Sequence, residues 1–369
     1  MFLPLVKPIL RLALKILSII LYLLTIFAAF GGRFDTEIFT FPAILTLGLP
    51  ILAFMTLIVT AVWFICRRIF MGALGVLAIL CCWGPISTVS PLSSPDDARR
   101  GEQTFTVMSW NIKHAQDQEV KDDSTGNRSI DYLVHCGADI VCLQELDAFS
   151  AKEIKNWSPE MRAQLMEVYP FWTGNKFTDQ MVLSKYPIIY QEGYNYIKEP
   201  YHPKRYSFYK VSIGDRVLTL IDLHLTSFAL DKEQQNFVTE MTSIGGVRKS
   251  MLELKDGIYA KLKHGFKTRR EDAAILRRAL QEIPGPLVIC GDLNDVPESY
   301  AYRLLRGNDL KDAYVETGFG PMVTFNQHMF WFHLDQIFYR GPLRALRVWR
   351  GNIKSSDHYP VYCEFAFEK

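Results

Sequence analysis

Residues 287–295 read Leu-Val-Ile-Cys-Gly-Asp-Leu-Asn-Asp and decide the fold of this chain. The run begins with apolar, strand-forming side chains and ends abruptly in Asp292 and Asn294. A buried strand that ends in this way delivers rigidly held polar groups to the edge of a sheet, where sheet-based enzymes keep their chemistry. The stretch therefore predicts a central strand whose end contributes to a functional site.

Outward from this strand, residues 104–369 alternate between expected strands and expected helices. Apolar runs and alternating patterns predict strands at 105–110, 139–143, 180–183, 207–213, 217–223, 330–339 and 361–367. Composition and apolar spacing predict helices at 127–136, 159–168 and 299–305. The pair Gly214-Asp215 is expected to join two of the strands in a hairpin.

Other strand-like runs also end in, or contain, polar side chains. Asn111, Glu145 and His224 each end such a run, Asp335 lies inside one, and His358 closely precedes the last. Taken singly, each has an ordinary structural explanation, such as a turn or a satisfied core histidine. A charged group in or at the end of an apolar strand is costly unless it is paired or binds a metal. The repetition of this feature predicts that the side chains converge on one site.

The residue types at these positions suit phosphate chemistry on a metal. Glu145 and Asn111 offer hard oxygen ligands of the kind that Mg²⁺ prefers. His224 and His358 can donate to phosphoryl oxygens or exchange protons near neutral pH. Asp335 can orient His358, as a carboxylate does in a catalytic triad.

The central stretch supplies the remaining groups, because Asp292 and Asn294 can position a water and a phosphate oxygen. The sequence has no Gly-x-Ser-x-Gly nucleophile elbow and no Cys–His arrangement of known type. Attack by metal-assisted water is therefore favoured over a covalent enzyme intermediate. The seven cysteines include no CxxC pair, which argues against a zinc site or a disulfide scaffold, although one disulfide in the soluble part stays open.

The first 95 residues are almost entirely apolar. Three runs, at 16–30, 41–66 and 69–89, come close to or exceed the roughly 20 apolar residues that a membrane-spanning helix needs. We therefore expect about three transmembrane helices. A cleaved signal peptide is the alternative for the first run, but it leaves the two further runs unexplained.

Basic residues set the expected orientation of these helices. Those before the first run and between the second and third runs mark the cytoplasmic side, whereas Asp35 and Glu37 beside Arg33 suit the opposite side. Three spans place everything after about residue 90 on the non-cytoplasmic side; two spans would make the domain cytoplasmic. The residues that mark the cytoplasmic side are Lys7, Arg11, Lys15, Arg67 and Arg68.

These patterns divide the chain into a membrane anchor over 1–89, a Ser/Pro-rich linker over 90–103 and a soluble domain over 104–369. Residues 1–95 hold six basic and two acidic side chains, which leaves 35 basic and 37 acidic ones for the rest. A soluble part without a basic excess is unlike a general nucleic-acid binder. Within it, residues 228–282 predict a polar helical insertion, which is either a solvated helical face or a basic arm that faces anionic headgroups or an anionic substrate.

Six short motifs in this order resemble the endonuclease/exonuclease/phosphatase superfamily, which includes DNase I, abasic-site endonucleases, neutral sphingomyelinases and inositol-phosphate 5-phosphatases. The resemblance covers about residues 104–369, and the order of the six motifs makes it specific. The motifs are Ser109-Trp110-Asn111-Ile112, Leu143-Gln144-Glu145, Asp222-Leu223-His224-Leu225, Gly291-Asp292-Leu293-Asn294, Leu334-Asp335-Gln336-Ile337-Phe338 and Ser356-Asp357-His358-Tyr359-Pro360.

This resemblance implies an α/β fold, a four-layer two-sheet sandwich like that of DNase I, here preceded by about three transmembrane helices. It implies a divalent metal, Mg²⁺ with Mn²⁺ as the alternative. The metal would lie on Glu145 with help from Asn111, and Asp357 would lie at or near it.

The resemblance also implies the catalytic roles. His358 would be the central catalytic histidine, paired with Asp335. Asp292 would polarise or deprotonate the attacking water, and Asn294 and His224 would hold the phosphate and stabilise its developing charge. The division of proton transfer between Asp292 and His358 stays open.

Some features depart from the family pattern. Residues 178–181 read Thr-Asp-Gln-Met, where relatives often carry small or apolar residues. No carboxylate partner for His224 is evident, His333 has no assignable family role, and the insertion is longer and more polar than compact nucleases need. These departures bear on the substrate more than on the type of reaction.

The expected function is that of a membrane-anchored, metal-dependent phosphoric-ester hydrolase that acts on a phosphodiester or phosphomonoester. The tether and the lack of a basic excess favour a lipid or headgroup substrate over nucleic acid. The alternative enzyme is an extracytoplasmic nuclease that degrades DNA or RNA. A catalytically silent binding module at the membrane is a third reading, but a silent relative would have lost part of the motif set that this chain retains.

Overall fold

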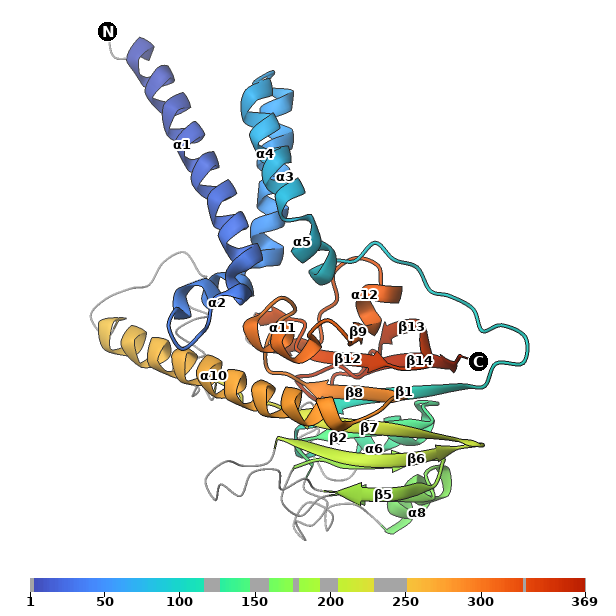
Figure 1. Ribbon diagram of the computed structural model, residues 1–369. Coiled ribbons are helices and arrows are strands. Elements are labelled where there is room, and N and C mark those ends of the chain that lie inside the picture. Colours follow the sequence, from blue (N-terminus) through green and yellow to red (C-terminus); the bar gives the residue numbers. More distant parts are fainter. Residues whose placement is uncertain are drawn as a thin grey trace.

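The computed structural model describes residues 3–115, 127–146, 159–174, 179–192, 205–228, 251–327 and 330–368. A group of apolar helices projects from one side of a domain that contains two large sheets (Figure 1). The N-terminal end of α1 and the turn between α3 and α4 lie at the end of this group that is far from the domain (Figure 1). The helices are α1 Leu3–Phe30, α2 Thr40–Leu47, α3 Leu49–Ile65, α4 Ile69–Cys81 and α5 Trp83–Val89, with a short 3-10 turn, η1, at Gly31–Arg33.

One of these helices, taken as Pro8–Arg33, is long and apolar enough by itself to cross a membrane. The apolar run 41–66 is not one helix, because α2 and α3 meet at Gly48 with a bend of 65°. Helices α4 and α5 are bent by the same angle at Cys82. Pro50 and Pro85 each lie in the first turn of the second helix of a pair, where a missing backbone N–H is tolerated. The candidate spans number up to three if each bent pair is one span.

Each large sheet has six strands and mixes parallel with antiparallel pairing. The first sheet has the order β13-β14-β1-β2-β4-β3, and the second has the order β5-β6-β7-β8-β12-β9. In the first sheet the strands are β1 Thr104–Asn111, β2 Ile140–Gln144, β3 Phe171–Gly174, β4 Met181–Ser184, β13 Leu343–Arg350 and β14 Val361–Phe367. In the second they are β5 Ile188–Glu192, β6 Tyr206–Ile213, β7 Arg216–His224, β8 Leu287–Asp292, β9 Lys311–Asp312 and β12 Asp335–Arg340.

The apolar faces of the two sheets pack against each other and form the central core, with Phe105, Val211 and Cys290 among its fully buried members. Helices α6 (Arg128–His135) and α8 (Pro159–Val168) cover the outer face of the first sheet. Helices α10 (Met251–Ala279) and α11 (Tyr300–Arg306) cover the outer face of the second. A short helix, α12 (Ala313–Thr317), lies beside β13. The two mixed sheets with their helices form the α/β sandwich that the sequence predicts.

Local sequence signals explain the element boundaries. The Asn127 side chain caps α6 by accepting from the backbone N–H groups of Ser129 and Ile130. Ser299 caps α11 in the same way, through the N–H of Tyr302. The strand expected at 361–367 and the helix expected at 159–168 have the predicted ends. The strands expected at 105–110, 139–143, 180–183, 207–213 and 217–223 and the helices expected at 127–136 and 299–305 end within one residue of prediction.

The single strand expected at 330–339 is wrong. Residues Phe330–Phe332 form β11, which pairs with β10 (Phe325–Gln327) in a separate two-stranded sheet, and only β12 joins the second large sheet. The strand pattern is interrupted at His333 and Leu334, between β11 and β12. There the backbone N–H groups of Leu334 and Asp335 donate to the Thr324 hydroxyl at 2.9 and 3.1 Å. A side-chain acceptor from a neighbouring segment thus replaces a strand partner and turns the chain at the first residue of β12.

The segment expected as a linker, 90–103, runs along the domain and is hydrogen-bonded to it. Ser93 Oγ donates to the Val315 carbonyl at 2.7 Å, and the Ser93 N–H donates to the Gly318 carbonyl at 3.0 Å. Farther along, Glu102 accepts from Arg344 Nη2 at 2.6 Å. Helix α10 occupies the described part of the insertion expected at 228–282; residues 229–250 lie outside the described residues.

Candidate active site

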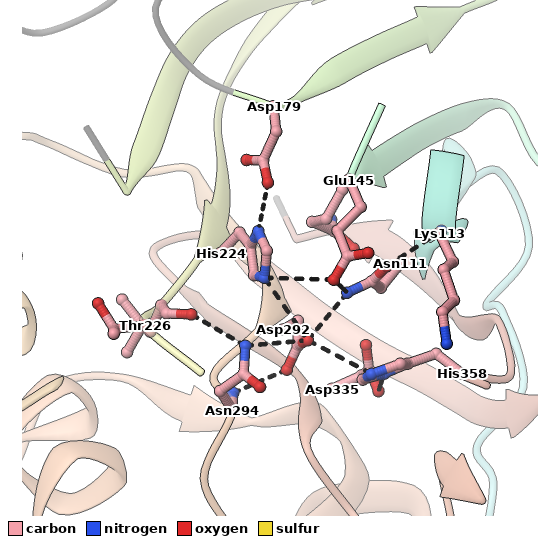
Figure 2. Close-up of polar contacts among 12 residues, drawn as sticks. Asn111, Lys113, Glu145, Asp179, His224, Thr226, Asp292, Asn294, Asp335 and His358 are labelled. Atoms are coloured by element: carbon pink, nitrogen blue, oxygen red, sulfur yellow. Dashed lines mark hydrogen bonds and ion pairs between the residues drawn. The ribbon is translucent and has the colours of Figure 1, made fainter. Parts of the chain in front are cut away.

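The site lies where strands from both sheets end. Asn111 is the last residue of β1 and Glu145 directly follows β2; these two strands run parallel. In the second sheet, Asp292 is the register partner of His224 on the parallel strand β7 and of Asp335 on β12. Because the carboxyl ends of parallel strands meet at one edge, both sheets deliver polar side chains to the same end of the sandwich (Figure 2).

Asn111 connects the two sheets at this edge. Its side-chain Nδ2 donates to Glu145 Oε1 at 3.0 Å and to Asp292 Oδ2 at 3.1 Å. Asn111 is almost completely buried, and its Oδ1 accepts from the backbone N–H of Lys113. One amide therefore holds two carboxylates from facing sheets close to each other.

Asp292 is fully buried at the centre of the cluster, and burial raises the pKa of its carboxyl. Its Oδ1 accepts from the Asn294 backbone N–H at 2.7 Å, and its Oδ2 lies 3.2 Å from Asn294 Nδ2. The preceding Gly291 has a φ of +147°, and a Cβ there would lie 1.9 Å from the Leu223 carbonyl oxygen. Glycine at 291 is therefore required for β8 to approach β7 and bring Asp292 beside His224.

A histidine–carboxylate pair lies beside Asp292, with His358 just before β14 of the first sheet and Asp335 on β12 of the second. His358 Nδ1 lies 2.8 Å from Asp335 Oδ2, the contact that the sequence predicts, and His358 Nε2 lies 3.5 Å from Asp292 Oδ2. Burial by itself lowers the pKa of His358, but the charges of Asp335 and Asp292 outweigh it and raise the pKa to about 10. The imidazole is thus held as a cation with its Nε2 directed into the site.

His224 and Asp179 form a second histidine–carboxylate pair, which the sequence did not predict. His224 Nδ1 lies 2.7 Å from Asp179 Oδ2, which supplies the carboxylate partner that the sequence did not reveal. Burial lowers the pKa of His224, but the hydrogen bond and charge of Asp179 outweigh it and raise the pKa to about 9. Asp179 directly precedes the Gln180 that leads into β4, so a carboxylate in the departing segment 178–181 was the available signal.

The second nitrogen of His224 points into the cluster (Figure 2). Its Nε2 lies 3.9 Å from Glu145 Oε1 and 4.0 Å from Asp292 Oδ2. Among the described residues this buried atom has no hydrogen-bond partner. Two cationic histidines therefore flank Asp292, and one of them carries a donor ready for an anionic oxygen.

The backbone beside Glu145 is unusual. Glu145 has a φ of +54°, and Lys113, His114 and Ala115 form a left-handed turn with φ between +48° and +58°. The turn lets the His114 N–H donate to the Glu145 carbonyl at 2.8 Å. Left-handed backbone at non-glycine residues costs roughly 1–3 kcal/mol each and gathers at functional sites.

Asp357 has a partner of its own, since its Oδ2 lies 2.6 Å from Lys113 Nζ. This ion pair lies next to the Asn111 turn and was not predicted, although a basic residue two positions after Asn111 was visible in the sequence. His333 lies apart from the cluster and packs edge-on against Tyr314 at 4.9 Å. Burial lowers the pKa of His333 to about 4, which keeps it neutral.

The donor set fits a hard divalent cation. Among the described residues, Asp292, Asp335 and His358 form a buried group in which one ligand atom of each lies within 4.8 Å of the others. Glu145 adds a carboxylate that is hydrogen-bonded to the same amide as Asp292. The carboxylate oxygens of this group are the ligands that Mg²⁺ and Mn²⁺ prefer. His358, held as a cation, has no free lone pair for the metal, and the Asn111 amide faces the carboxylates with its Nδ2 donor.

The two-sheet fold and a match to a family model together define a hydrolase that acts on phosphoesters. Residues 108–358 match the model of the Endonuclease/Exonuclease/phosphatase family, and the chain belongs to that family. Enzymes of this family generally depend on a divalent metal. Residues 11–89 match the model of a domain of unknown function, DUF8431.

Solved structures that are similar to this chain include D. rerio TDP2 complexed with a single-strand DNA product, which is 16% identical, with 71% of this chain and 99% of that chain covered and a TM-score of 0.48. The human Nocturnin catalytic domain with bound sulfate is 17% identical, with 72% and 97% covered and a TM-score of 0.44. A family protein from Bacteroides thetaiotaomicron is 15% identical, with 72% and 96% covered and a TM-score of 0.45. No curated protein sequence matches the chain.

Proposed function

We propose that this chain is a membrane-anchored, divalent-metal-dependent hydrolase in which water attacks a phosphoester presented at the membrane surface, with a lipid or headgroup phosphodiester as substrate. One observation carries the proposal. A single buried amide, that of Asn111, joins Glu145 to Asp292, and two histidine–carboxylate pairs flank Asp292 at the same edge.

Glu145 and Asn111 would hold the metal, and Asp357 would contribute if it is released from Lys113. A metal held there would supply Lewis-acid chemistry that neutralises charge on the phosphoryl group. The crowding of Glu145 and Asp292 around one amide supports a cation at this position, because a positive charge relieves the repulsion between the two carboxylates.

Residues of the chain activate the attacking water and stabilise the charge on the phosphoryl group. Asp292 orients the attacking water and accepts its proton, and the Asn294 amide fixes the Asp292 carboxylate for this task. His224 and His358, both held cationic by their carboxylate partners, donate from Nε2 to the phosphoryl oxygens as negative charge develops there. Asp179 and Asp335 keep the two rings in orientation.

The anchor supports a membrane-surface substrate. Figure 1 shows the N-terminal end of α1 and the α3–α4 turn far from the domain, whereas the α1–α2 loop lies beside it. With three spans, the N-terminal end of α1 and the α3–α4 turn, which carries Arg67 and Arg68, would lie on the cytoplasmic side. The domain would then lie on the non-cytoplasmic side.

The test uses the full-length chain in lipid nanodiscs with Mg²⁺ and a panel of phosphatidylcholine, sphingomyelin, inositol phosphates, plasmid DNA and RNA. We expect release of a headgroup phosphate product from a lipid. Hydrolysis of nucleic acid alone would replace the lipid assignment with that of a nuclease. No hydrolysis of any phosphoester would overturn the proposed function.

Glu145→Ala provides the check on the site. We expect this change to abolish hydrolysis, with a loss of at least about 100-fold in kcat. The unfolding temperature should stay within a few degrees, because the Glu145 side chain is partly exposed and directly follows the strand. Glu167→Ala, an exposed glutamate on α8, is the matched control and should retain full activity. Retained activity in Glu145→Ala would remove Glu145 from the metal site.

A further inference from the structure

The loop between the first two apolar helices, residues 31–39, is docked on the catalytic domain through ion pairs. Arg270 of α10 lies 2.8 Å from Asp35 and 3.1 Å from Glu37, and Lys267 lies 3.5 Å from Glu37. Figure 1 shows α10 passing beside α2, directly below this loop. The loop that the sequence marks as acidic thus meets the insertion that the sequence marks as basic.

Close packing accompanies these charges. Thr36 is almost completely buried, and its hydroxyl donates to the Phe266 carbonyl at 3.3 Å. A Cβ at Gly32 would lie 1.8 Å from the carbonyl oxygen of Glu298, which precedes α11. Only glycine permits this approach, so the loop is fitted to the domain by shape as well as by charge.

Arg269, the neighbour of Arg270 on α10, extends away from the loop 31–39 and into the domain. Arg269 is fully buried, with its guanidinium stacked on Phe228 at 4.0 Å. Its Nε donates to Asp295 Oδ2 at 3.0 Å, and its Nη1 donates to the Thr226 carbonyl at 2.9 Å. The Thr226 hydroxyl is also tied to α10, through Asp272 Oδ2 at 3.0 Å.

Thr226 and Asp295 belong to the two loops that carry active-site groups. Asp295 directly follows Asn294, and Thr226 lies two residues after His224. The loops are joined to each other, because Asn294 Nδ2 donates to the Leu225 carbonyl at 2.9 Å and the Leu225 N–H donates to the Asp292 carbonyl at 2.9 Å. Figure 2 shows Thr226 beside Asn294 at the rim of the cluster.

We propose that the anchor loop 31–39 is part of the catalytic unit: it fixes α10, and Arg269 of α10 acts as a positioning residue that holds the loops of His224 and Asn294 in register. Deletion of the anchor, or rupture of its ion pairs, loosens these loops. The planar guanidinium of Arg269 bonds both loops at once, which explains why residue 269 is an arginine. A lysine ammonium cannot reach both partners with fixed geometry. The activity part of this proposal rests on the proposed function.

The experiment compares full-length variants in nanodiscs on bis(p-nitrophenyl) phosphate, a soluble diester whose access does not depend on the membrane. Lys267→Glu/Arg270→Glu reverses the domain side of the contact, and adding Asp35→Lys/Glu37→Lys restores opposite charges. Arg278→Glu, at an exposed position of the same helix, is the matched control. Backbone hydrogen exchange at 225–228 and 293–296 is measured on each variant.

We expect Lys267→Glu/Arg270→Glu to lower kcat about 10-fold with KM within about twofold, to speed exchange in both site loops, and to regain wild-type values in the charge-swapped protein. Arg269→Lys should give the same kcat loss and faster exchange. If the reversed variant matches Arg278→Glu in kcat and in loop exchange, the proposal is wrong. If the wild type cleaves no diester, the proposed function fails. Hydrogen exchange at 225–228 and 293–296 then tests the coupling by itself: faster exchange in Lys267→Glu/Arg270→Glu supports it, and unchanged exchange contradicts it.

Discussion

At the residue scale, the site is a symmetric arrangement around one buried carboxylate. The Nε2 atoms of His224 and His358 lie 4.0 and 3.5 Å from Asp292 Oδ2. Each histidine is paired through Nδ1 with its own aspartate, Asp179 or Asp335. Burial by itself favours the neutral form of both histidines and of Asp292. The charges of the neighbouring carboxylates keep the histidines cationic, and the Nε2 atom of each ring faces the cluster.

Asp179→Asn tests the half of this arrangement that the sequence did not reveal. The change keeps the side-chain shape but removes the charge that holds His224 protonated and oriented. We expect kcat to fall on the order of 100-fold while the unfolding temperature changes little, because Asp179 is partly exposed. Asp215→Asn, in the exposed turn of the β6–β7 hairpin, is the control. Equal activity in both variants would show that His224 does not need a charged partner.

Another buried carboxyl, that of Asp222, lies between the sheets outside the catalytic cluster. Its Oδ1 accepts from Gln144 Nε2 at 2.6 Å, and among the described residues its Oδ2 has no hydrogen-bond partner. Burial raises the pKa of Asp222 well above its ordinary value, so the folded protein takes up a proton that the unfolded chain releases above about pH 4. The stability that this proton provides is complete below the unfolded pKa and is lost as pH rises towards the folded pKa.

Asp222→Asn removes this dependence by replacing the carboxyl with a neutral amide of the same shape. We expect the variant to gain stability over the wild type as pH rises from 4.5 to 7.5, by up to about 1.4 kcal/mol per pH unit below the folded pKa. Thermal unfolding in detergent across this range measures the difference. A difference that stays constant with pH would mean that Asp222 is not protonated in the folded chain.

At the element scale, the break between β11 and β12 decides where Asp335 stands. The hydroxyl of Thr324, itself fully buried, accepts from the N–H groups of Leu334 and Asp335 and so fixes the start of β12. Asp335 is thereby placed opposite Asp292 in the register of β8 and within reach of His358. A continuous strand over 330–339 would have no such turn to start β12 at Asp335.

Thr324→Val keeps the branched shape and removes the acceptor. Two buried N–H groups then lose their partner, so we expect a loss of about 1–3 kcal/mol in the free energy of unfolding together with a lower kcat. Thr268→Val, at a surface position of α10, removes a hydroxyl of little consequence and serves for comparison. A variant as stable and active as this control would show that the Thr324 hydroxyl does not hold β12 in place.

At the scale of the whole molecule, anchor and domain are joined at more than one place. The loop 31–39 contacts α10 and α11. Ser93, in the segment after α5, is hydrogen-bonded to Val315 in α12 and to Gly318 just after it. These contacts lie far apart along the chain, so they restrict rotation of the domain relative to the apolar helices. A domain held in this way keeps one orientation relative to the apolar helices.

Protease protection tests the orientation of the whole chain. With three spans, the domain lies on the non-cytoplasmic side, because the basic residues at the N-terminus and at Arg67 and Arg68 stay in the cytoplasm. We expect protease to cleave the domain in right-side-out vesicles and to spare it in inside-out vesicles. The opposite pattern would mean that the third apolar run does not span the membrane.

The sequence by itself determined the local elements and the identity of most groups in the cluster. Alternating apolar patterns and capping residues such as Asn127 and Ser299 act over a few positions, so strand and helix ends were predictable. The motif order likewise predicted the contact of His358 with Asp335. These features depend on neighbouring residues or on a recognisable pattern, and both are present in the linear chain.

The tertiary structure alone decided the partners that come from distant segments. It paired Asp179 with His224, assigned Lys113 to Asp357, and let Thr324 break an apolar run that reads as one strand. It also divided the basic insertion, with Arg269 buried behind the site loops and Arg270 bound to the anchor. Composition cannot distinguish a solvated arginine from a buried one, because burial and pairing depend on which surfaces meet when the chain folds.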